Sequence, residues 1–369
     1  MVEVRELIGI MNDWAPPSFA ESWDNVGLMT GDDESLVSSV IVTLDVSEET
    51  VEKAAGEGAL IITHHPPVFK PLKSLAGTDV ASRIVRLAVK RDVTVFAAHT
   101  NLDRAPGGVG DALAETLGLT MVSKLETPRC KFFKFVTFAP ADAVEGIRCA
   151  AGKAGAGVIG RYSMCSFETS GTGTFIPSAD ANPHSGKPGV LSREAETRLE
   201  MIVPAHLSDM VVAAARNAHP YEEMAFDLIP LENTDSTIGY GAVGELDRPM
   251  SPDSFAGYVA ERLGIGTVTV SETAPDTIRR VAVMGGKGRD FIGRAASVGA
   301  DAYVTGELGH HDYIECPGDM MLVDATHCAT ERPVLDAIRN RLAASMPGEG
   351  LVYHIQDGLA PFRVINRYS

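Results

Sequence analysis

Cysteine is scarce in this sequence of 369 residues, and long hydrophobic runs are missing. The five cysteines are scattered and form no CxxC pair, which favours neither a disulfide framework nor a zinc ribbon. No apolar run approaches the roughly 18 residues that a membrane span requires. The opening segment carries acidic residues and lacks the apolar stretch of a secretory signal. We therefore expect a cytoplasmic protein that does not enter the membrane.

Positive charge is also scarce. Lys and Arg number 32 against 49 Asp and Glu, which gives a formal net charge of −17. A field of this sign repels phosphate backbones, so general nucleic-acid binding is disfavoured, although a local metal site can reverse the sign of the potential. The hydrophobic fraction of 45% is ordinary for a globular chain, and the length predicts two domains or one large domain with an insertion.

Both ends of the chain show the alternating strand and helix pattern of an α/β fold. Apolar runs predict strands at 38–46, 59–65, 91–100, 279–288, 300–308 and 319–327. Amphipathic spacing predicts helices at 48–58, 80–91, 291–299 and 331–345. We therefore expect one discontinuous α/β domain with mostly parallel strands, made of residues 1–124 and 237–369.

The middle of the chain, residues 125–236, has a different pattern. Alternating segments predict strands at 131–140, 198–206 and 224–231, with helices at 141–155 and 207–219. A β-α-β pattern that occurs twice predicts an inserted α+β domain of the ferredoxin-like type. We expect the glycine-rich segment 171–175 to be a flexible loop that can act as a lid. Residues 219–223 (HPYEE) are either a recognition surface or a helix end.

Histidines at predicted strand ends carry the functional hypothesis. Three strands are followed by possible metal ligands, namely His64 and His65, His99 and Asp103, and His327 and Glu331. Ligands of open α/β sheets bind at the carboxyl ends of the strands, so these side chains should meet. The competing interpretation is that each histidine only packs or forms a hydrogen bond at its strand end.

The spacing of these residues indicates more than one metal ion. Adjacent histidines on an extended strand point to opposite sides, but His64 and His65 can reach two nearby ions if the chain turns there. His327 and Glu331 share one face if the chain becomes helical after Thr326. Three imidazoles and two carboxylates are too few for two complete coordination spheres, so a bridging carboxylate and waters would complete them. This arrangement is typical of a hydrolytic two-metal centre with room for substrate.

Five ordered motifs resemble the Nif-three-like dinuclear metal-centre family, whose members are often labelled GTP cyclohydrolase 1 type 2 homologs. They are ESWDNVGLMTGD (21–32), ITHHPPVF (62–69), HTNLDRAPGGVGDALAE (99–115), GADAYVTGELGHHDYIE (299–315) and DATHCATE (324–331). The middle of the chain is similar to the longer bacterial form through residues 155–177 and 218–233. The resemblance spans essentially the whole chain. Its departures are Thr326 in place of glycine, Gly110 in place of asparagine, and His310 in place of an aromatic residue.

The resemblance implies two divalent metal ions per subunit, held by His64, His65, Asp103, His327 and Glu331. The spacing argument had indicated the same five residues. The resemblance also implies a toroidal homohexamer whose sites face an internal cavity. In that assembly the inserted domain would have a PII-like signalling fold and cap the openings of the ring.

Three further residues are candidates for catalysis. His99 can hold a phosphate or orient a metal ligand, or it can simply form a hydrogen bond at a strand end. Glu307 and His311 follow a strand that ends near the other sites, where they can serve as acid or base. The remaining histidines at 184, 206, 219 and 354 are expected to be structural or on the surface, and Cys328 is expected to pack.

Two short segments allow both a functional and a structural interpretation. Trp23, Asp24 and Asn25 can form a pocket rim that supports the ligands, or a turn fixed by an Asx bond beside a buried indole. The segment GGKG (285–288) lacks the spacing of a phosphate-binding loop, so a tight turn between strand and helix is expected.

These observations predict a metal-dependent hydrolase that acts on a small nucleotide or phosphoester. Imidazole and carboxylate ligands suit zinc, iron, manganese, cobalt or nickel and do not distinguish them. The cyclohydrolase label comes from the resemblance, and no residue here specifies guanine. The alternative is a metal-binding regulatory or metabolite-sensing protein without turnover, and a third hypothesis is a scaffold that binds a protein partner through the insert.

Overall fold

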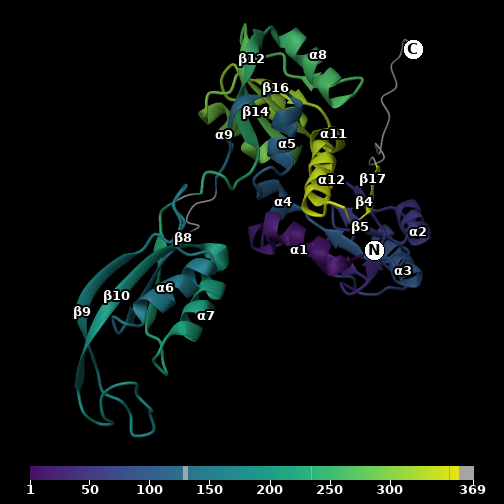
Figure 1. Cartoon of the computed structure of the whole chain (residues 1–369). Coiled ribbons are helices and arrows are strands. Elements are labelled where there is room, and N and C mark those ends of the chain that lie inside the picture. Colours follow the sequence, from purple (N-terminus) through teal and green to yellow (C-terminus); the bar gives the residue numbers. More distant parts are fainter. Residues whose placement is uncertain (128–131, 234, 349, 357–369) are drawn as a thin grey trace, which may run out of the picture. The chain divides into compact units, whose positions relative to one another are not determined.

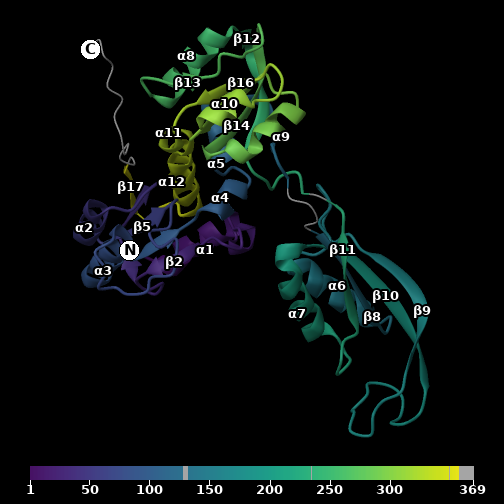
Figure 2. The ribbon, with the colours of Figure 1, turned by 180° about the vertical axis from the view of Figure 1, so that it is seen from behind.

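The chain consists of two compact units in a computed structural model that describes residues 1–127, 132–233, 235–348 and 350–356 (Figures 1 and 2). The outer unit combines the N-terminal segment up to Thr127 with the segment from Ser236 onward, and the inserted unit lies between them in sequence. The final part of the predicted outer domain, 357–369, and Lys131 of the predicted strand 131–140 lie outside the described residues. Among the described helices, none has the length and apolar character to cross a membrane.

The outer unit contains two large sheets and one two-stranded sheet, rather than a single sheet. The first has the order β17-β4-β5-β6-β2, with only β2 antiparallel to its neighbour. Its strands are β2 (Gly27–Thr30), β4 (Ser39–Thr43), β5 (Ala59–Thr63), β6 (Val95–Ala97) and β17 (Val352–Gln356). Strands β4 and β5 are buried along their whole length, as expected for a sheet that is covered on both faces.

Helices cover both faces of this first sheet. Side chains alternate along β4, so that Val40 and Val42 pack in one core while Ile41 packs in another. The first core is shared with α1 (Val4–Trp14) and α12 (Pro333–Ser345), and the second with α2 (Glu48–Glu57) and α3 (Val80–Arg91). Helix α3 spans the predicted residues because Asp79 caps its first turn and Asp92 ends it in a left-handed conformation.

The second sheet has the order β13-β16-β15-β14-β12-β7, and its strands β14, β15 and β16 are parallel. The strands are β7 (Thr120–Ser123), β12 (Ala242–Met250), β13 (Thr269–Val270), β14 (Ile278–Lys287), β15 (Ala302–Gly306) and β16 (Met321–Asp324). One core packs against α5 (Val109–Thr116) and α8 (Pro252–Leu263), and the other against α9 (Ile292–Ser297). Both faces of this sheet are therefore buried as well.

Short elements follow the strand ends of both sheets. They are α4 (Thr100–Arg104) after β6, α10 (His310–Ile314) after β15 and α11 (His327–Glu331) after β16. The other short elements are β1 (Val2–Glu3), β3 (Leu36–Val37), and the 3-10 helices η1 (Pro17–Phe19), η2 (Ala205–Leu207) and η3 (Arg289–Phe291). Helices α4 and α11 bring residues of the two sheets together, as described below.

The inserted unit has the element order β-α-β-β-α-β, which is that of a ferredoxin-like module. Its antiparallel sheet has the strand order β11-β8-β10-β9. The elements are β8 (Phe132–Ala139), α6 (Val144–Lys153), β9 (Phe167–Phe175), β10 (Ser192–Pro204), α7 (Ser208–Ala218) and β11 (Phe226–Leu231). Phe135, Leu199 and Met201 of the sheet form its core with residues of both helices.

The expected flexible loop at 171–175 is wrong. These residues belong to β9, which pairs with β10 from Phe167 to Phe175. Backbone pairing with a long neighbouring strand overrides the weak strand preference of Gly171 and Gly173. The Cβ of a larger residue at 173 would lie 2.0 Å from Glu196 Oε2, so the glycine gives that side chain room across the strand.

Candidate metal centre

The candidate centre begins where β5 ends. The His64 amide donates a hydrogen bond to the Thr43 carbonyl at 3.0 Å, and the His65 amide donates to the Leu44 carbonyl at 2.8 Å. This pairing with the end of β4 continues past the strand and fixes both backbones. The two imidazole centroids lie 5.0 Å apart with a tilt of 46°, so the side chains are neighbours rather than on opposite faces. His64 is fully buried.

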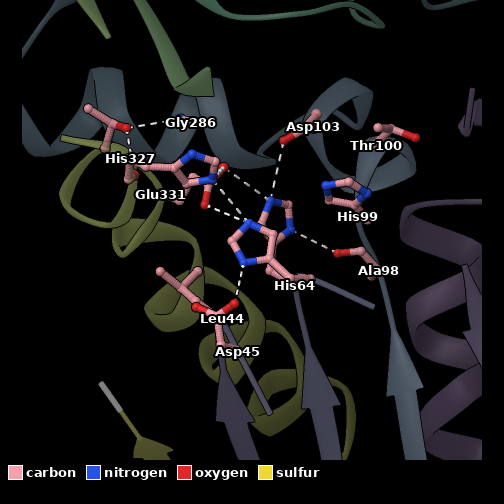
Figure 3. Close-up of polar contacts among 12 residues, drawn as sticks. Leu44, Asp45, His64, Ala98, His99, Thr100, Asp103, Gly286, His327 and Glu331 are labelled. Atoms are coloured by element: carbon pink, nitrogen blue, oxygen red, sulfur yellow. Dashed lines mark hydrogen bonds and ion pairs between the residues drawn. The ribbon is translucent and has the colours of Figure 1, made fainter. Parts of the chain in front are cut away.

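Four imidazoles are held from outside the cluster through their Nδ1 atoms, and the contacts with Ala98 and Asp45 can be followed in Figure 3. The four contacts are His64 with the Ala98 carbonyl at 2.9 Å, His65 with Asp45 at 2.9 Å, His99 with Asp24 at 2.8 Å and His327 with Glu307 at 2.9 Å. Each acceptor is an oxygen, so each Nδ1 donates, and each Nε2 is left to bind a metal ion once it carries no proton. Metal-binding histidines are oriented in this way in proteins, with the second nitrogen held by a carboxylate or carbonyl.

The Nε2 atoms meet the two carboxylates in one small volume. His65 Nε2 lies 3.2 Å from His327 Nε2, and each is about equally close to Glu331, at 3.0 Å from Oε2 and 3.1 Å from Oε1, respectively. His64 Nε2 lies 3.7 Å from both Asp103 and Glu331. All five residues that were predicted as metal ligands are thus brought together, although they come from three strand ends in two sheets.

The buried donor atoms fit a metal ion better than they fit one another. His64 Nε2 is buried and has no hydrogen-bond partner among the described residues. A buried polar atom without a partner is costly, and a cation would satisfy it. The donor atoms form two sets, and within each set all atoms lie within 4.8 Å of one another. One set is His64, His65 and His99, and the other is His65, His327 and Glu331. Imidazole nitrogens with carboxylate oxygens form the donor set of divalent zinc and its transition-metal neighbours.

The electrostatics of the cluster point the same way. Although burial opposes it, the hydrogen bonds that His65 donates to Asp45 and Glu331 raise the pKa of His65 to about 10. Burial also acts against ionisation of Glu331, yet the imidazoles of His64 and His327 hold its pKa well below the usual range. Burial raises the pKa of Asp103. The carboxylates thus stabilise positive charge on the imidazoles, and bound cations would take the place of these protons.

Helix α11 supplies His327 and Glu331 on one face, as the i, i+4 spacing predicted. The residue before it, Thr326, has φ 69° and ψ 154°, a region that is otherwise populated almost only by glycine. This is the position at which the related motif has glycine. The Thr326 amide donates to Asp324 at 2.9 Å, which helps to hold the turn.

The expected turn between strand and helix is found only at the last residue of GGKG, and the role of this segment in the site was missed. Residues up to Lys287 belong to β14, with an irregular register before it, and the turn follows at Gly288. Gly286 has φ 65°, and a Cβ there would lie 2.2 Å from Glu331 Oε1. Its amide donates to Thr330 Oγ1 at 2.9 Å. The pair of glycines was the available signal, because close approach of a backbone to a ligand requires this residue.

The three catalytic candidates lie in different surroundings. The His99 ring centroid lies 5.2 Å from that of His64 and 5.6 Å from that of His65. Glu307 contacts His327 from the side opposite the cluster. The side chain of His311 is 79% exposed and lies 4.0 Å from Glu315. The structure therefore brings His99 and Glu307 to the cluster and gives His311 contacts elsewhere.

The Trp23–Asn25 segment supports the cluster through Asp24, which holds His99 and the start of α4. Asp24 accepts hydrogen bonds from His99, from the Thr100 amide and hydroxyl, and from the Asn25 amide, the last at 2.8 Å. Hydrogen bonds of His99 and Thr100, acting against burial, hold the pKa of Asp24 far below its usual range. The indole of Trp23 is 58% exposed, so the expectation of a buried indole is wrong.

Comparison with known proteins identifies the family of the chain. The family model Duf34/NIF3 (NGG1p interacting factor 3) matches residues 2–356. The chain belongs to this family. The predicted family is therefore confirmed, and with it the mixed α/β fold.

Several members of the Duf34/NIF3 family are similar over most of their length. The GTP cyclohydrolase 1 type 2 homolog of Halalkalibacterium halodurans is 40% identical over 309 residues, which is 83% of each chain. That of Mycobacterium tuberculosis is 35% identical over 357 residues, or 94% of each chain. The crystal structure of a Bacillus cereus protein related to NIF3 superposes with a TM-score of 0.82 at 36% identity and covers 99% of both chains.

Proposed function

We propose that this member of the Duf34/NIF3 family is a metal-dependent hydrolase that acts on a nucleotide or phosphoester. His64, His65, Asp103, His327 and Glu331 would hold two divalent ions. The observation that carries the proposal is the convergence of Nε2 atoms and carboxylates, with every Nδ1 directed outward to an oxygen. When bound, such ions supply hydrolytic chemistry by making water a nucleophile near neutral pH.

The residues of the chain divide the work of binding and orientation. Glu331 directs its Oε2 at His65 and its Oε1 at His327, so each oxygen would help to hold an ion together with one of these imidazoles. Asp45 and Glu307 hold the imidazoles of His65 and His327 in one tautomer. The contact of His99 Nδ1 with Asp24 orients this ring, so that its Nε2 is left to form a hydrogen bond with a substrate.

Metal analysis tests the centre directly. Protein purified without added metal should contain about two divalent ions per chain, as expected for two-metal hydrolases. The donor set does not choose among zinc, iron, manganese, cobalt and nickel, so all five should be measured. Less than one ion per chain after reconstitution with each metal would remove the two-metal proposal.

Turnover is tested with a panel of nucleotides and phosphoesters. His327→Ala should abolish turnover with any substrate found, and it should leave the chain folded. His310→Ala is the matched control, because His310 lies in α10, outside both donor sets, and its ring contacts that of His311. Equal activity of the two variants would contradict the hydrolase proposal.

The alternative function is regulation or metabolite sensing without turnover. A cavity of about 780 Å³ in the inserted unit favours it, because this volume is in the range of small-molecule sites. It is lined by β9, by the segment before β10 and by residues near Tyr221. A sensor would show a ligand-dependent change in hydrogen exchange, and it would show no turnover with any compound of the panel.

We also propose, from the family resemblance, a cytoplasmic toroidal homohexamer in which residues 125–236 form a separate PII-like domain. The edge strand β9 of the insert is exposed along most of its length, which suits pairing between copies. Native mass spectrometry should give six chains. Deletion of residues 126–235 should lower this number.

The same deletion variant tests the scaffold hypothesis. If it binds a protein partner as well as the full-length chain does, the insert is not the binding surface and the hypothesis is removed.

A further inference from the structure

We propose that Trp23 and Phe69 form an aromatic platform at the mouth of the candidate centre and that it stacks a planar heteroaromatic ring of the substrate. This inference rests on the proposed function and deepens it. It selects a ring-bearing nucleotide over a simple phosphoester as the class of substrate. We use the term platform below for these two side chains.

The platform is exposed although both of its rings are large and apolar. Trp23 is 58% exposed and Phe69 is 43% exposed. Their centroids lie 5.8 Å apart with an interplanar angle of 59°, so the two rings form tilted walls and do not cover each other's faces. The other tryptophan, Trp14, is 5% exposed, and its Nε1 donates to the Pro106 carbonyl at 2.7 Å. An open indole in this chain is therefore a particular feature of residue 23.

Both aromatic side chains stand on segments that are fixed by hydrogen bonds. Asp24, next to Trp23, is held by His99 and by the Thr100 amide at 3.1 Å. Asn25 donates through Nδ2 to the carbonyl of Val68, next to Phe69, at 2.5 Å. The two segments are thus tied to each other and to the start of α4. A ring that stacks here meets a preformed surface, which lowers the entropy cost of binding.

The platform is continuous with the candidate metal centre. The Phe69 ring lies edge-on to His99 with 6.2 Å between centroids, and His99 in turn lies edge-on to His64 and His65. One row of rings therefore leads from exposed Trp23 to buried His64. A substrate with one end at the metal ligands could extend along this row of rings and place a second group over the platform.

A planar ring fits this surface better than the other possible occupants. Indole and phenyl faces stack on aromatic bases without contacting the hydrogen-bonding groups at the edges of the bases. The platform therefore selects planar rings and does not distinguish one base from another. The platform also lies in the row of rings that leads to the candidate ligands, so it is placed to contact a substrate that is bound there. We therefore assign the platform to the substrate.

Fluorescence and calorimetry on the zinc-loaded full-length protein test the assignment. Guanosine, adenosine and uridine monophosphates are the ring-bearing probes, and ribose 5-phosphate is the probe without a ring. The nucleotides should quench the emission of exposed Trp23, after correction for their own absorption, and ribose 5-phosphate should not. Trp23→Phe removes this quenching and should keep most of the affinity, because it keeps an aromatic face.

The binding constants decide the outcome. Trp23→Ala should weaken nucleotide binding by about 5- to 100-fold, the usual effect of losing one stacked base. Its affinity for ribose 5-phosphate should change less than about twofold on the same reasoning. Phe69→Leu should have the same direction of effect. Unchanged nucleotide affinity in Trp23→Ala, or no binding of any nucleotide to the wild-type protein, would overturn the assignment.

Two measurements on the same samples separate this inference from the proposed function. Metal content should be unchanged in Trp23→Ala, because Trp23 lies in neither set of donor atoms. A wild-type protein with two ions per chain and turnover, but with nucleotide binding indifferent to Trp23, leaves the hydrolase and removes the platform. A change in assembly mass in Trp23→Ala, without a change in nucleotide affinity, would instead make the platform a contact between copies.

Discussion

The chain contains two pairs of adjacent histidines, and they lie in opposite environments. His64 and His65 follow the buried strand β5, and their centroids lie 5.0 Å apart. His310 and His311 open the short helix α10, with a similar centroid distance of 5.5 Å. The first pair meets carboxylates from other strand ends, whereas His311 contacts Glu315 of its own turn at 4.0 Å. The dipeptide is the same, so its place in the fold decides its chemistry.

The two histidine pairs differ in the contacts that hold each imidazole at its Nδ1 atom. Each imidazole of the first pair has an oxygen acceptor on Nδ1, which directs Nε2 inward. His311 uses its Nδ1 for the distant contact with Glu315, and its side chain is 79% exposed. Preorganisation, rather than the presence of imidazole, therefore distinguishes a candidate metal centre from a polar surface.

The test with the largest expected effect compares alanine substitutions in the two histidine pairs. His64→Ala or His65→Ala should lower metal affinity by more than about 100-fold, because a ligand is lost and not only its support. His310→Ala and His311→Ala should keep the metal content of the wild-type protein. Competition with a chromophoric chelator gives the affinities, and elemental analysis gives the content. Equal metal loss in both sets would erase the contrast between the pairs.

A second test removes the support and leaves the ligand. Asp45→Asn keeps the size of the side chain that holds His65 Nδ1, but it removes the charge. Metal affinity should fall by about 10- to 100-fold, the usual effect of losing such a partner. Glu315→Gln, the matched change beside His311, should have no effect on it. An Asp45→Asn variant with wild-type affinity would show that orientation by this carboxylate is dispensable.

The pH dependence of metal binding sharpens the contrast further. The pKa of His65 is raised to about 10 in the metal-free protein, so this imidazole carries a proton at neutral pH, and a metal ion must displace it. Metal affinity should therefore rise with pH, by about tenfold per unit for each displaced proton. Calorimetry in buffers of different ionisation enthalpy counts the protons released. A pH-independent affinity between about pH 6 and about pH 8 would contradict the protonated state.

The smallest expected effect concerns the backbone before α11. Thr326 has φ 69°, whereas Gly309, before α10, has an ordinary φ of −94°. Thr326→Gly should raise the free energy of unfolding of the metal-free protein by about 1 kcal/mol, since relief of strain exceeds the entropy cost of glycine. Urea unfolding measures this change. A less stable variant would mean that contacts of the Thr326 side chain outweigh the strain.

Local patterns predicted much of the fold. Helix α3 was predicted at its observed bounds because an amphipathic period and an N-cap act within a few residues. The strands of the outer unit were predicted to end one to three residues beyond their observed ends, because the polar side chains that follow each apolar run were counted with it. The five candidate ligands were still visible near these ends. Even Asp45 ends one of these runs, although its role as the partner of His65 was not foreseen.

Features that depend on contacts between distant segments were not predicted. Strand β9 exists because β10 pairs with it, and the glycines inside it indicated a loop. The division of the outer segments into two sheets depends on which strands pair, and the same alternating pattern fits either solution. Gly286 and Glu331 are 45 residues apart in sequence but lie in contact in the structure. The reason why residue 286 must be glycine, namely the space that Glu331 occupies, is therefore visible only in the structure.

The two halves of the candidate centre leave the ribosome at different times. Asp103 is followed by about 220 residues, including the whole insert, before His327 is made. At typical rates of 5–20 residues per second, His64, His65 and Asp103 wait for about 10–45 s without their partners. The N-terminal strands must fold, or be protected, while three polar side chains at one edge lack their partners His327 and Glu331. An ion that joined both halves could then bind only after the whole insert had been made, so metal binding would be one of the last steps in the folding of the outer unit.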